Sequence, residues 1–189
     1  MGNVLVYFNP DISINKYCKT EEEKEIIKKA LFGGKEWLMG DAGEISNKDL
    51  FEKVKHKVPE NYYESLKNCA ENWNICTTPL KGAKEFCNYV KNKGYGIYVL
   101  SNASDKFYDY FPNFLPLDFF NGIVLSSDIH ILKPNEDIFK YILNKYNLKE
   151  EECLFIDDKD YNIEAAKKLN FKAEVFQENF DEIIKKYDL

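Results

Sequence analysis

The sequence predicts an α/β protein, with a Rossmann-like parallel sheet flanked by helices and an inserted small helical-bundle cap. Three observations indicate this fold. Strand-length apolar runs alternate with helical periods from residue 78 to the C-terminus. About ninety residues separate the first two such runs, far more than one crossover helix requires. The segment between those runs is rich in helical periods.

The first strand is expected at Val4–Phe8, a β-branched and aromatic run that Asn9 and Pro10 close. The next part of the chain contains helical periods at Glu21–Phe32, Lys48–His56 and Tyr62–Trp73. Glycines and a proline separate these periods, as in short loops. We therefore expect two domains, an α/β core of residues 1–11 and 78–189 and a helical cap of residues 12–77.

The rest of the chain returns to the sheet. Thr78 and Pro79 form a helix start, and Gly94 stops that helix. The elements expected after it are a strand at 95–100, a strand at 122–125, a helix at 134–146, a strand at 153–157, a helix from 162, a strand at 173–176 and a closing helix from 180. Strands that alternate with helices of about ten residues indicate parallel βαβ units.

The composition excludes several classes of protein. A hydrophobic fraction of 44% is that of a globular chain, and a net charge of −6 argues against nucleic acid as a partner. The five cysteines are odd in number and scattered, which is typical of reduced thiols. No run is long enough for a membrane span, and the N-terminus lacks the pattern of a signal peptide. We expect a cytoplasmic protein with no membrane or nucleic-acid partner.

The most informative feature is the pair Asp157 and Asp158, which follows an apolar run and precedes a helical period. Ligands bind at the carboxyl ends of strands in open α/β sheets. Adjacent carboxylates repel each other unless a cation lies between them, and Mg²⁺ suits a few carboxylates together with water and phosphate. The alternative is a helix N-cap with one acid that complements the helix dipole. We favour metal binding, in which Asn162 supports the site or caps the helix.

Two further stretches of the chain indicate a phosphate site only when they are considered together with this aspartate pair. Ser101 and Asn102 place a hydroxyl and an amide at the end of a strand, where they can hold phosphate oxygens, although such residues also form ordinary turns. Lys133 precedes a helix and can reach an anion there, although a solvated loop lysine is the commoner case. The two histidines, His56 and His130, have no ligand spacing, and we assign them no role.

Taken in order, these positions resemble motifs II, III and IV of the haloacid dehalogenase-like hydrolase superfamily. The matching stretches are Leu100–Asn102, Lys133-Pro134, and Phe155–Asp158 with Asn162–Ala166. Other stretches resemble the phosphatase branch whose first motif reads Asp-x-Gly-Asn-Val. They are Trp37-Leu38, Gly43–Ser46, Pro79–Gly82 and Gly122–Ser126. The resemblance covers nearly the whole chain, including the helical cap.

The resemblance implies a mechanism. The first aspartate of motif I attacks phosphorus to form an aspartyl-phosphate, which water then hydrolyses. Ser101 and the Asn102 amide would bind the phosphate, and Lys133 would be the catalytic cation that neutralises phosphate and nucleophile.

The resemblance also implies a metal site, in which Asp158, Asp157 and the Gly2 carbonyl hold Mg²⁺. Paired aspartates in motif IV favour a phosphatase over a dehalogenase, whose attack on carbon uses no metal.

Motif I departs from the family pattern. Aligning Gly2–Val6 with that motif places Met1 at its second position, so the nucleophilic aspartate would lie just before Met1. Either an internal methionine was taken as the start, or the natural chain has lost its nucleophile, and we favour the first explanation. Gly2 also stands where many relatives carry an acid/base aspartate, and Asp11 is too far along the chain to replace it.

The sequence therefore predicts a Mg²⁺-dependent phosphatase acting on a small phosphorylated metabolite, with this chain impaired. The alternative is a catalytically inactive relative that binds such a metabolite or a partner protein, and a haloacid dehalogenase is disfavoured. The sequence reveals neither the substrate nor the oligomeric state. The cap residues Trp37, Tyr62, Tyr63 and Trp73 line a pocket or pack the bundle, and we favour packing.

Overall fold

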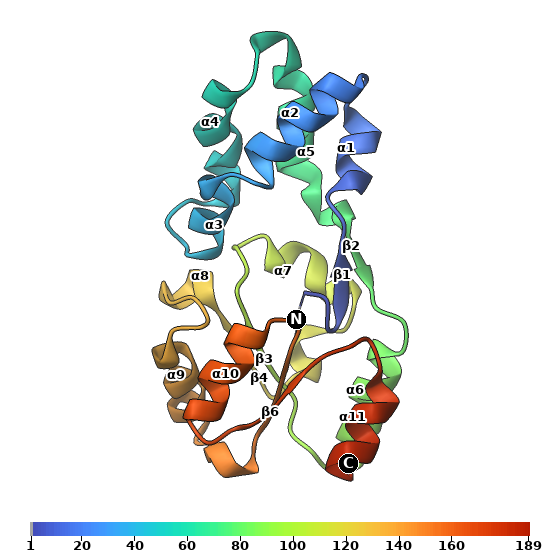
Figure 1. Cartoon of the computed structure of the whole chain (residues 1–189), viewed down its shortest axis with the longest axis vertical. Helices are drawn as coiled ribbons and strands as arrows, with labels where there is room; N and C mark the ends of the chain where they lie inside the picture. The colour runs from blue at the N-terminus through green and yellow to red at the C-terminus, as the bar shows by residue number, and fades with distance from the viewer. Residues whose placement is uncertain (1) are drawn as a thin grey trace.

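The computed structural model describes residues 2–189, which form two lobes joined by a pair of strands (Figure 1). One lobe is helical and lies between the two joining strands in the sequence. Its helices are α1 (Asp11–Tyr17), α2 (Glu21–Leu31), α3 (Lys35–Asp41), α4 (Leu50–Val54) and α5 (Tyr63–Asn72). Short 3₁₀ turns lie at Asn47–Asp49, Lys55–Lys57, Glu60–Tyr62 and Trp73–Cys76.

The helical lobe has its own apolar core. Helix α2 begins with a capping box, in which the Thr20 hydroxyl accepts from the Glu23 N–H and the Glu23 carboxylate accepts from the Thr20 N–H. Ile27, Leu31 and Leu66 are fully buried in the cluster that the helices share. Burying such side chains stabilises this packing by roughly 1.5–3 kcal/mol each.

The joining strands differ from the sequence prediction. Strand β1 (Val6–Phe8) pairs antiparallel with β2 (Thr77–Pro79), so neither belongs to the parallel sheet. The strand predicted at 4–8 is confirmed for Val6–Phe8 only, because residues 4 and 5 form a turn, and Tyr7 is 45% exposed rather than buried. The predicted helix start at 78 and 79 is wrong. Those residues pair with β1, and the helix begins at Ala83.

The second lobe is the α/β core, and it confirms the predicted fold class. Its strands are β3 (Tyr98–Ser101), β4 (Gly122–Leu125), β5 (Leu154–Asp157) and β6 (Lys172–Val175). Its helices are α6 (Ala83–Asn92), α7 (Phe107–Tyr110), α8 (Ser126–Ile129), α9 (Glu136–Tyr146), α10 (Asp160–Lys168) and α11 (Phe180–Tyr187), with 3₁₀ turns at Phe111–Asn113, Leu117–Phe119 and Glu150–Glu152. β3 pairs in parallel with β4, and β5 pairs in parallel with β6.

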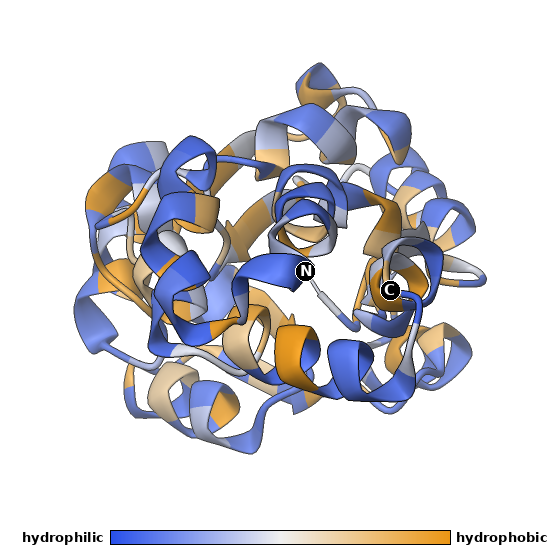
Figure 2. Ribbon diagram, turned by 90° about the horizontal axis from the view of Figure 1, so that it is seen from above, coloured by the Kyte–Doolittle hydropathy of each residue, from blue (hydrophilic) through white to orange (hydrophobic). Residues whose placement is uncertain are grey.

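Aromatic and aliphatic side chains hold the helices against these strands. The Phe139 ring of α9 is fully buried, and it meets the rings of Phe155 and Phe171 at centroid distances of 5.2 and 5.9 Å. Hydrophilic and hydrophobic stretches alternate along the helices when the molecule is viewed from above, as expected for amphipathic helices (Figure 2). Within residues 2–189, no helix combines the length and apolar character needed to cross a membrane.

Candidate functional site

The candidate site lies where two strands end, one from each of the two parallel pairs. Ser101 is the last residue of β3, and Asp157 is the last residue of β5. Lys133 comes from the loop between α8 and α9. All three residues are buried. The structure thus brings together residues from three of the motifs that the sequence singled out.

The Lys133 ammonium and the Asp157 carboxylate form a buried ion pair. Lys133 Nζ lies 2.5 Å from Asp157 Oδ2, and the two residues are only 6% and 2% exposed. The same ammonium donates to the Leu100 carbonyl at 3.1 Å. Lys133 therefore links the end of β3 to the end of β5. A charge-assisted hydrogen bond of this kind, shielded from water, fixes the position of both groups.

The other Asp157 oxygen is also engaged. Asp157 Oδ1 accepts from the Lys159 backbone N–H at 3.0 Å and from Asn162 Nδ2 at 2.9 Å. Burial alone would raise the pKa of the Asp157 carboxyl, but the Lys133 ammonium and the Asn162 amide hold it below its usual value. Asp157 is therefore ionised at neutral pH, and its position is fixed from both sides.

Asn102 positions the lysine loop through its side chain. Its Nδ2 donates to the Lys133 carbonyl at 3.0 Å, and its Oδ1 accepts from the Lys133 N–H at 2.8 Å. The neighbouring Ser101 is 2% exposed, and its hydroxyl donates to the Asn102 carbonyl at 3.3 Å. The Asn102 side chain therefore holds the lysine loop against the end of β3.

Asp158 is the more accessible of the two aspartates. Its Oδ2 accepts from Asn3 Nδ2 at 3.1 Å and lies 3.0 Å from Lys159 Nζ. Asn3 has a positive φ of 55° and follows Gly2, so the Asn3 contact brings the Gly2 turn to the end of β5. Met1, at the second position of the aligned first motif, lies outside the described residues.

The donor set suits a hard divalent cation. Two adjacent carboxylates present oxygen atoms, and Mg²⁺ is commonly held by one or two carboxylates with water and phosphate in its other positions. The buried Asn162 Oδ1, beside Asp157, has no hydrogen-bond partner in the structure. An acceptor in this state can serve a metal-bound water. Among residues 2–189 no third Asp, Glu, His or Cys side chain joins the two aspartates.

Some residues around the site were missed by sequence reasoning. Asn3 and Lys159 both contact Asp158, but a single asparagine in a turn and one lysine in a lysine-rich chain give no usable signal. Asn162, for which support of the site or helix capping was predicted, contacts Asp157. His130 contacts the Ala42 carbonyl at 3.1 Å through Nδ1.

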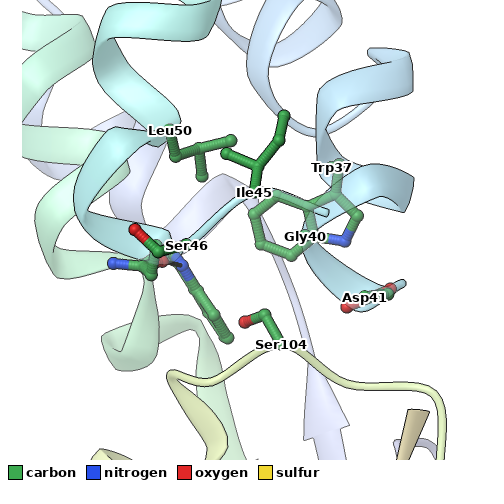
Figure 3. A pocket seen from close by; sticks show the side chains of 9 residues that line it. Trp37, Gly40, Asp41, Ile45, Ser46, Leu50 and Ser104 are labelled. Carbon is green, nitrogen blue, oxygen red and sulfur yellow. Dashed lines mark hydrogen bonds between the residues drawn. The ribbon is translucent and has the colours of Figure 1, made fainter. Parts of the chain in front are cut away.

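A small pocket lies where the helical lobe meets the core (Figure 3). Trp37 and Trp73 are among the residues that line it, and Asp41 and Ser104 lie at its lower rim. The two indole rings also pack on each other with centroids 5.0 Å apart. These tryptophans therefore both pack the lobe boundary and line a pocket, where the sequence left the two roles as alternatives.

The fold and the strand-end site define an α/β protein with a helical insertion, of the kind that carries its site at the carboxyl ends of its strands. Residues 16–175 match the haloacid dehalogenase-like hydrolase family, and the chain belongs to this family of enzymes.

Solved structures from the same family resemble the chain over nearly its whole length. One is a haloacid dehalogenase (HAD) family enzyme from Bacteroides thetaiotaomicron in complex with magnesium and inorganic phosphate. It has a TM-score of 0.72 and 21% identity, and the match covers 95% of this chain and 92% of that chain. A predicted HAD-like family hydrolase from Porphyromonas gingivalis has a TM-score of 0.69 and 25% identity, with coverage of 98% and 93%.

An L-2-haloacid dehalogenase from Xanthobacter autotrophicus is also similar. Its TM-score is 0.62 at 15% identity, and the match covers 98% of this chain and 80% of that chain.

Proposed function

We propose that the site belongs to a Mg²⁺-dependent phosphatase that acts on a small phosphorylated metabolite through an aspartyl-phosphate. The observation that carries this proposal is the buried Lys133–Asp157 pair beside Asp158, where β3 and β5 end. Burying an ion pair costs desolvation free energy, and a catalytic role would explain why this protein keeps the pair. The magnesium and phosphate complex of the Bacteroides enzyme supports the same chemistry.

The chain's own residues supply the anion site. The Ser101 hydroxyl and the Asn102 backbone N–H offer donors to phosphate oxygens at the end of β3. Lys133 Nζ neutralises charge on the phosphate and on an attacking carboxylate. Asn102 holds the lysine loop in place through its two hydrogen bonds to the Lys133 peptide groups.

Asp158 and Asp157 would hold the Mg²⁺ ion, with the Gly2 carbonyl as a further ligand and Asn162 as an acceptor for bound water. When bound, Mg²⁺ offsets negative charge on the phosphoryl oxygens. Asp158 has the larger share in holding it, because both Asp157 oxygens already accept hydrogen bonds from the protein.

The nucleophile is proposed to be an aspartate directly before Met1, so this 189-residue chain would be impaired. The turn at Gly2 and Asn3 supports this placement, because Asn3 contacts Asp158 at the end of β5. We further propose that residues 12–77 act as a cap over the site, that the protein works in the cytoplasm, and that it binds neither nucleic acid nor membrane.

The alternative is a protein of this family that binds a phosphorylated metabolite or a partner without turnover. The observation that favours it is that both Asp157 oxygens accept hydrogen bonds from the protein itself. The pair could therefore have a purely structural role, with no substrate needed to complete its contacts. A haloacid dehalogenase is the less favoured candidate, because two adjacent aspartates suit a metal that attack on carbon does not need.

The test is hydrolysis of p-nitrophenyl phosphate with Mg²⁺ by three proteins. They are this chain, the chain extended upstream by Ile-Ile-Phe-Asp, and a matched control extended by Ile-Ile-Phe-Asn. Asp158→Ala in the aspartate-extended form tests the metal site. We expect activity only in the aspartate-extended form, and we expect Asp158→Ala to abolish it.

Each other outcome has a meaning. Equal activity of the aspartate and asparagine extensions would contradict an upstream nucleophile. Mg²⁺ binding without turnover in all folded forms would favour the binding protein. Halide release from a 2-haloacid that persists in chelator would favour the dehalogenase.

A further inference from the structure

The proposed phosphatase needs a proton donor for its leaving group, and Gly2 cannot supply one. Asp41 is a carboxyl group that the helical lobe brings to the core. It is the last residue of α3 and lies with Ser104 at the lower rim of the pocket (Figure 3). Ser104 lies only three positions after Ser101 and two after Asn102, the two residues proposed to bind phosphate. Asp41 thus lies beside the loop that continues from the phosphate site.

A chain of hydrogen bonds fixes Asp41 to that loop. The Ala103 backbone N–H donates to Ser126 Oγ at 3.1 Å, and the Ser126 hydroxyl donates to the Asp41 carbonyl. Ser126 is fully buried, so water does not compete for these bonds. Next to Asp41, His130 Nδ1 lies 3.1 Å from the Ala42 carbonyl. The main chain of Asp41 is therefore held by the core rather than by its own helix alone.

The surroundings of the carboxyl favour its protonated form. Burial raises the pKa of Asp41 to about 7, although the backbone N–H of Ser104 favours the charged form. Burial and the nearby Asp41 charge also raise the pKa of Tyr110. None of the ion pairs found among residues 2–189 includes Asp41. A carboxyl that is half protonated near neutral pH can give up and regain a proton under working conditions.

We propose that Asp41 is the catalytic acid that protonates the leaving-group oxygen, a role that rests on the proposed phosphatase function. The attacking carboxylate oxygen forms a bond to phosphorus, and the bond between phosphorus and the ester oxygen breaks. The electron pair of the broken bond stays on the ester oxygen, which takes the proton from the Asp41 carboxyl. The Asp41 carboxylate then accepts the proton of the water that hydrolyses the aspartyl-phosphate.

The small size of the pocket limits how a leaving group can reach Asp41. Its volume of about 10 Å³ is close to what a single water molecule needs. A leaving group larger than water therefore enters only when the helical lobe moves relative to the core. Asp41 returns to the loop when the lobes close, so protonation and closure occur together.

The experiment compares two leaving groups in the aspartate-extended protein. Phenyl phosphate has a basic leaving group that needs a proton, whereas p-nitrophenyl phosphate has a stable anionic leaving group. We expect Asp41→Asn to lower kcat/KM for phenyl phosphate about 100-fold and to leave p-nitrophenyl phosphate nearly unchanged. The control is Asp105→Asn, another aspartate at the lobe boundary, which accepts from the Asn47 N–H. It should affect both esters equally.

Carbon-13 NMR of the side-chain carboxyls in the 189-residue chain tests Asp41 without turnover, with the signal assigned by its loss in Asp41→Asn. We expect a titration midpoint near pH 7. A midpoint below about pH 5 would overturn the proposal, since the group would then be ionised like an ordinary carboxylate. The proposal would also be overturned if Asp41→Asn lowered kcat/KM equally for phenyl phosphate and p-nitrophenyl phosphate. Failure of every extended form to hydrolyse either ester would instead reject the phosphatase function, and the acid role with it.

Discussion

Lys133 Nζ lies 2.5 Å from Asp157 Oδ2 and 3.1 Å from the Leu100 carbonyl, so one ammonium group bridges two strands that belong to different two-stranded sheets. β3 carries Leu100 and β5 carries Asp157, and these strands do not pair with each other. The bridge therefore combines two roles. It holds the two strand ends together, and it places a positive charge at the proposed phosphate site.

Replacing Lys133 should destabilise the protein strongly. Lys133→Met leaves the buried Asp157 charge without its cation, and breaking a buried pair in this way costs about 3–5 kcal/mol. Urea denaturation should show this loss in the free energy of unfolding. The exposed pair of Lys140 and Glu136 provides the control, because Lys140→Met should change stability by less than about 0.5 kcal/mol.

The double variant Lys133→Met with Asp157→Asn measures the direct interaction between the two groups, apart from their contacts with the rest of the protein. We expect it to be more stable than the sum of the two single variants predicts, because no unpaired charge remains. Simple additivity would contradict a direct coupling between the two groups.

Acid should weaken the protein through Asp157. The folded-state pKa of this carboxyl lies below its unfolded value. The stabilisation is therefore complete above the unfolded pKa of about 3.9 and is lost as the pH falls through the folded pKa. Urea unfolding between pH 7 and pH 2 should show a steeper loss for the natural protein than for Asp157→Asn. Parallel curves for the two proteins would contradict the depressed pKa.

Asp41 should have the opposite effect on stability. Its folded-state pKa of about 7 lies above the unfolded value, so folding stability falls as the pH rises from about 4 to 7. The difference amounts to about 1.4 kcal/mol for each unit between the two pKa values. Asp41→Asn removes this penalty, so the variant should gain stability relative to the natural protein at pH 8 but not at pH 4. A pH-independent difference would show that burial leaves the carboxyl pKa unchanged.

The sequence predicted the strand ends well and the lobe boundary poorly. The runs that end at Ser101 and Asp157 are apolar, β-branched and followed by helices, and local pattern is sufficient for such elements. Val4–Phe8 has the same local pattern, yet only Val6–Phe8 forms a strand, because its partner is β2 rather than the parallel sheet. The partner of a strand is a tertiary property that its own residues do not encode.

Asp41 shows the same limit at the candidate site. An aspartate at the end of a short helix in a chain with 32 acidic residues gives no signal of its own. Its environment depends on Ser104 and Ser126, which lie more than sixty residues further along the chain. The motif positions, in contrast, could be found because each follows a predicted strand or precedes a predicted helix.

Mg²⁺ should stabilise the 189-residue chain through Asp158, independently of turnover. Thermal unfolding with increasing MgCl₂ should raise the Tm of the natural chain, because a ligand that binds only the folded state stabilises it. Asp158→Asn should remove most of this shift, whereas the exposed Asp118→Asn should keep it. Ca²⁺ should be less effective, since two carboxylates supply few of the oxygens that it prefers. An equal rise in the Tm of Asp158→Asn would show that Mg²⁺ binds at another place in the protein.

Trp73 should be the main apolar link between the lobes. It is 5% exposed, and its ring lies 6.0, 5.0 and 5.6 Å from the ring centroids of Phe8, Trp37 and Tyr110. These partners belong to β1, α3 and α7, so the indole connects the joining strand, the helical lobe and the core.

Truncating this ring should therefore cost stability and loosen the boundary. Trp73→Ala should lower the free energy of unfolding by about 3–5 kcal/mol, because it leaves a cavity that three elements share. Hydrogen exchange should also accelerate at the backbone amides of α3, whose Trp37 loses one of its aromatic partners. Tyr95→Ala is the control. Tyr95 is 47% exposed, so its replacement should change the free energy of unfolding by less than about 0.5 kcal/mol. A stability loss without faster exchange in α3 would mean that the helical lobe is held mainly by the hydrogen bonds of Ser126 and Asp105.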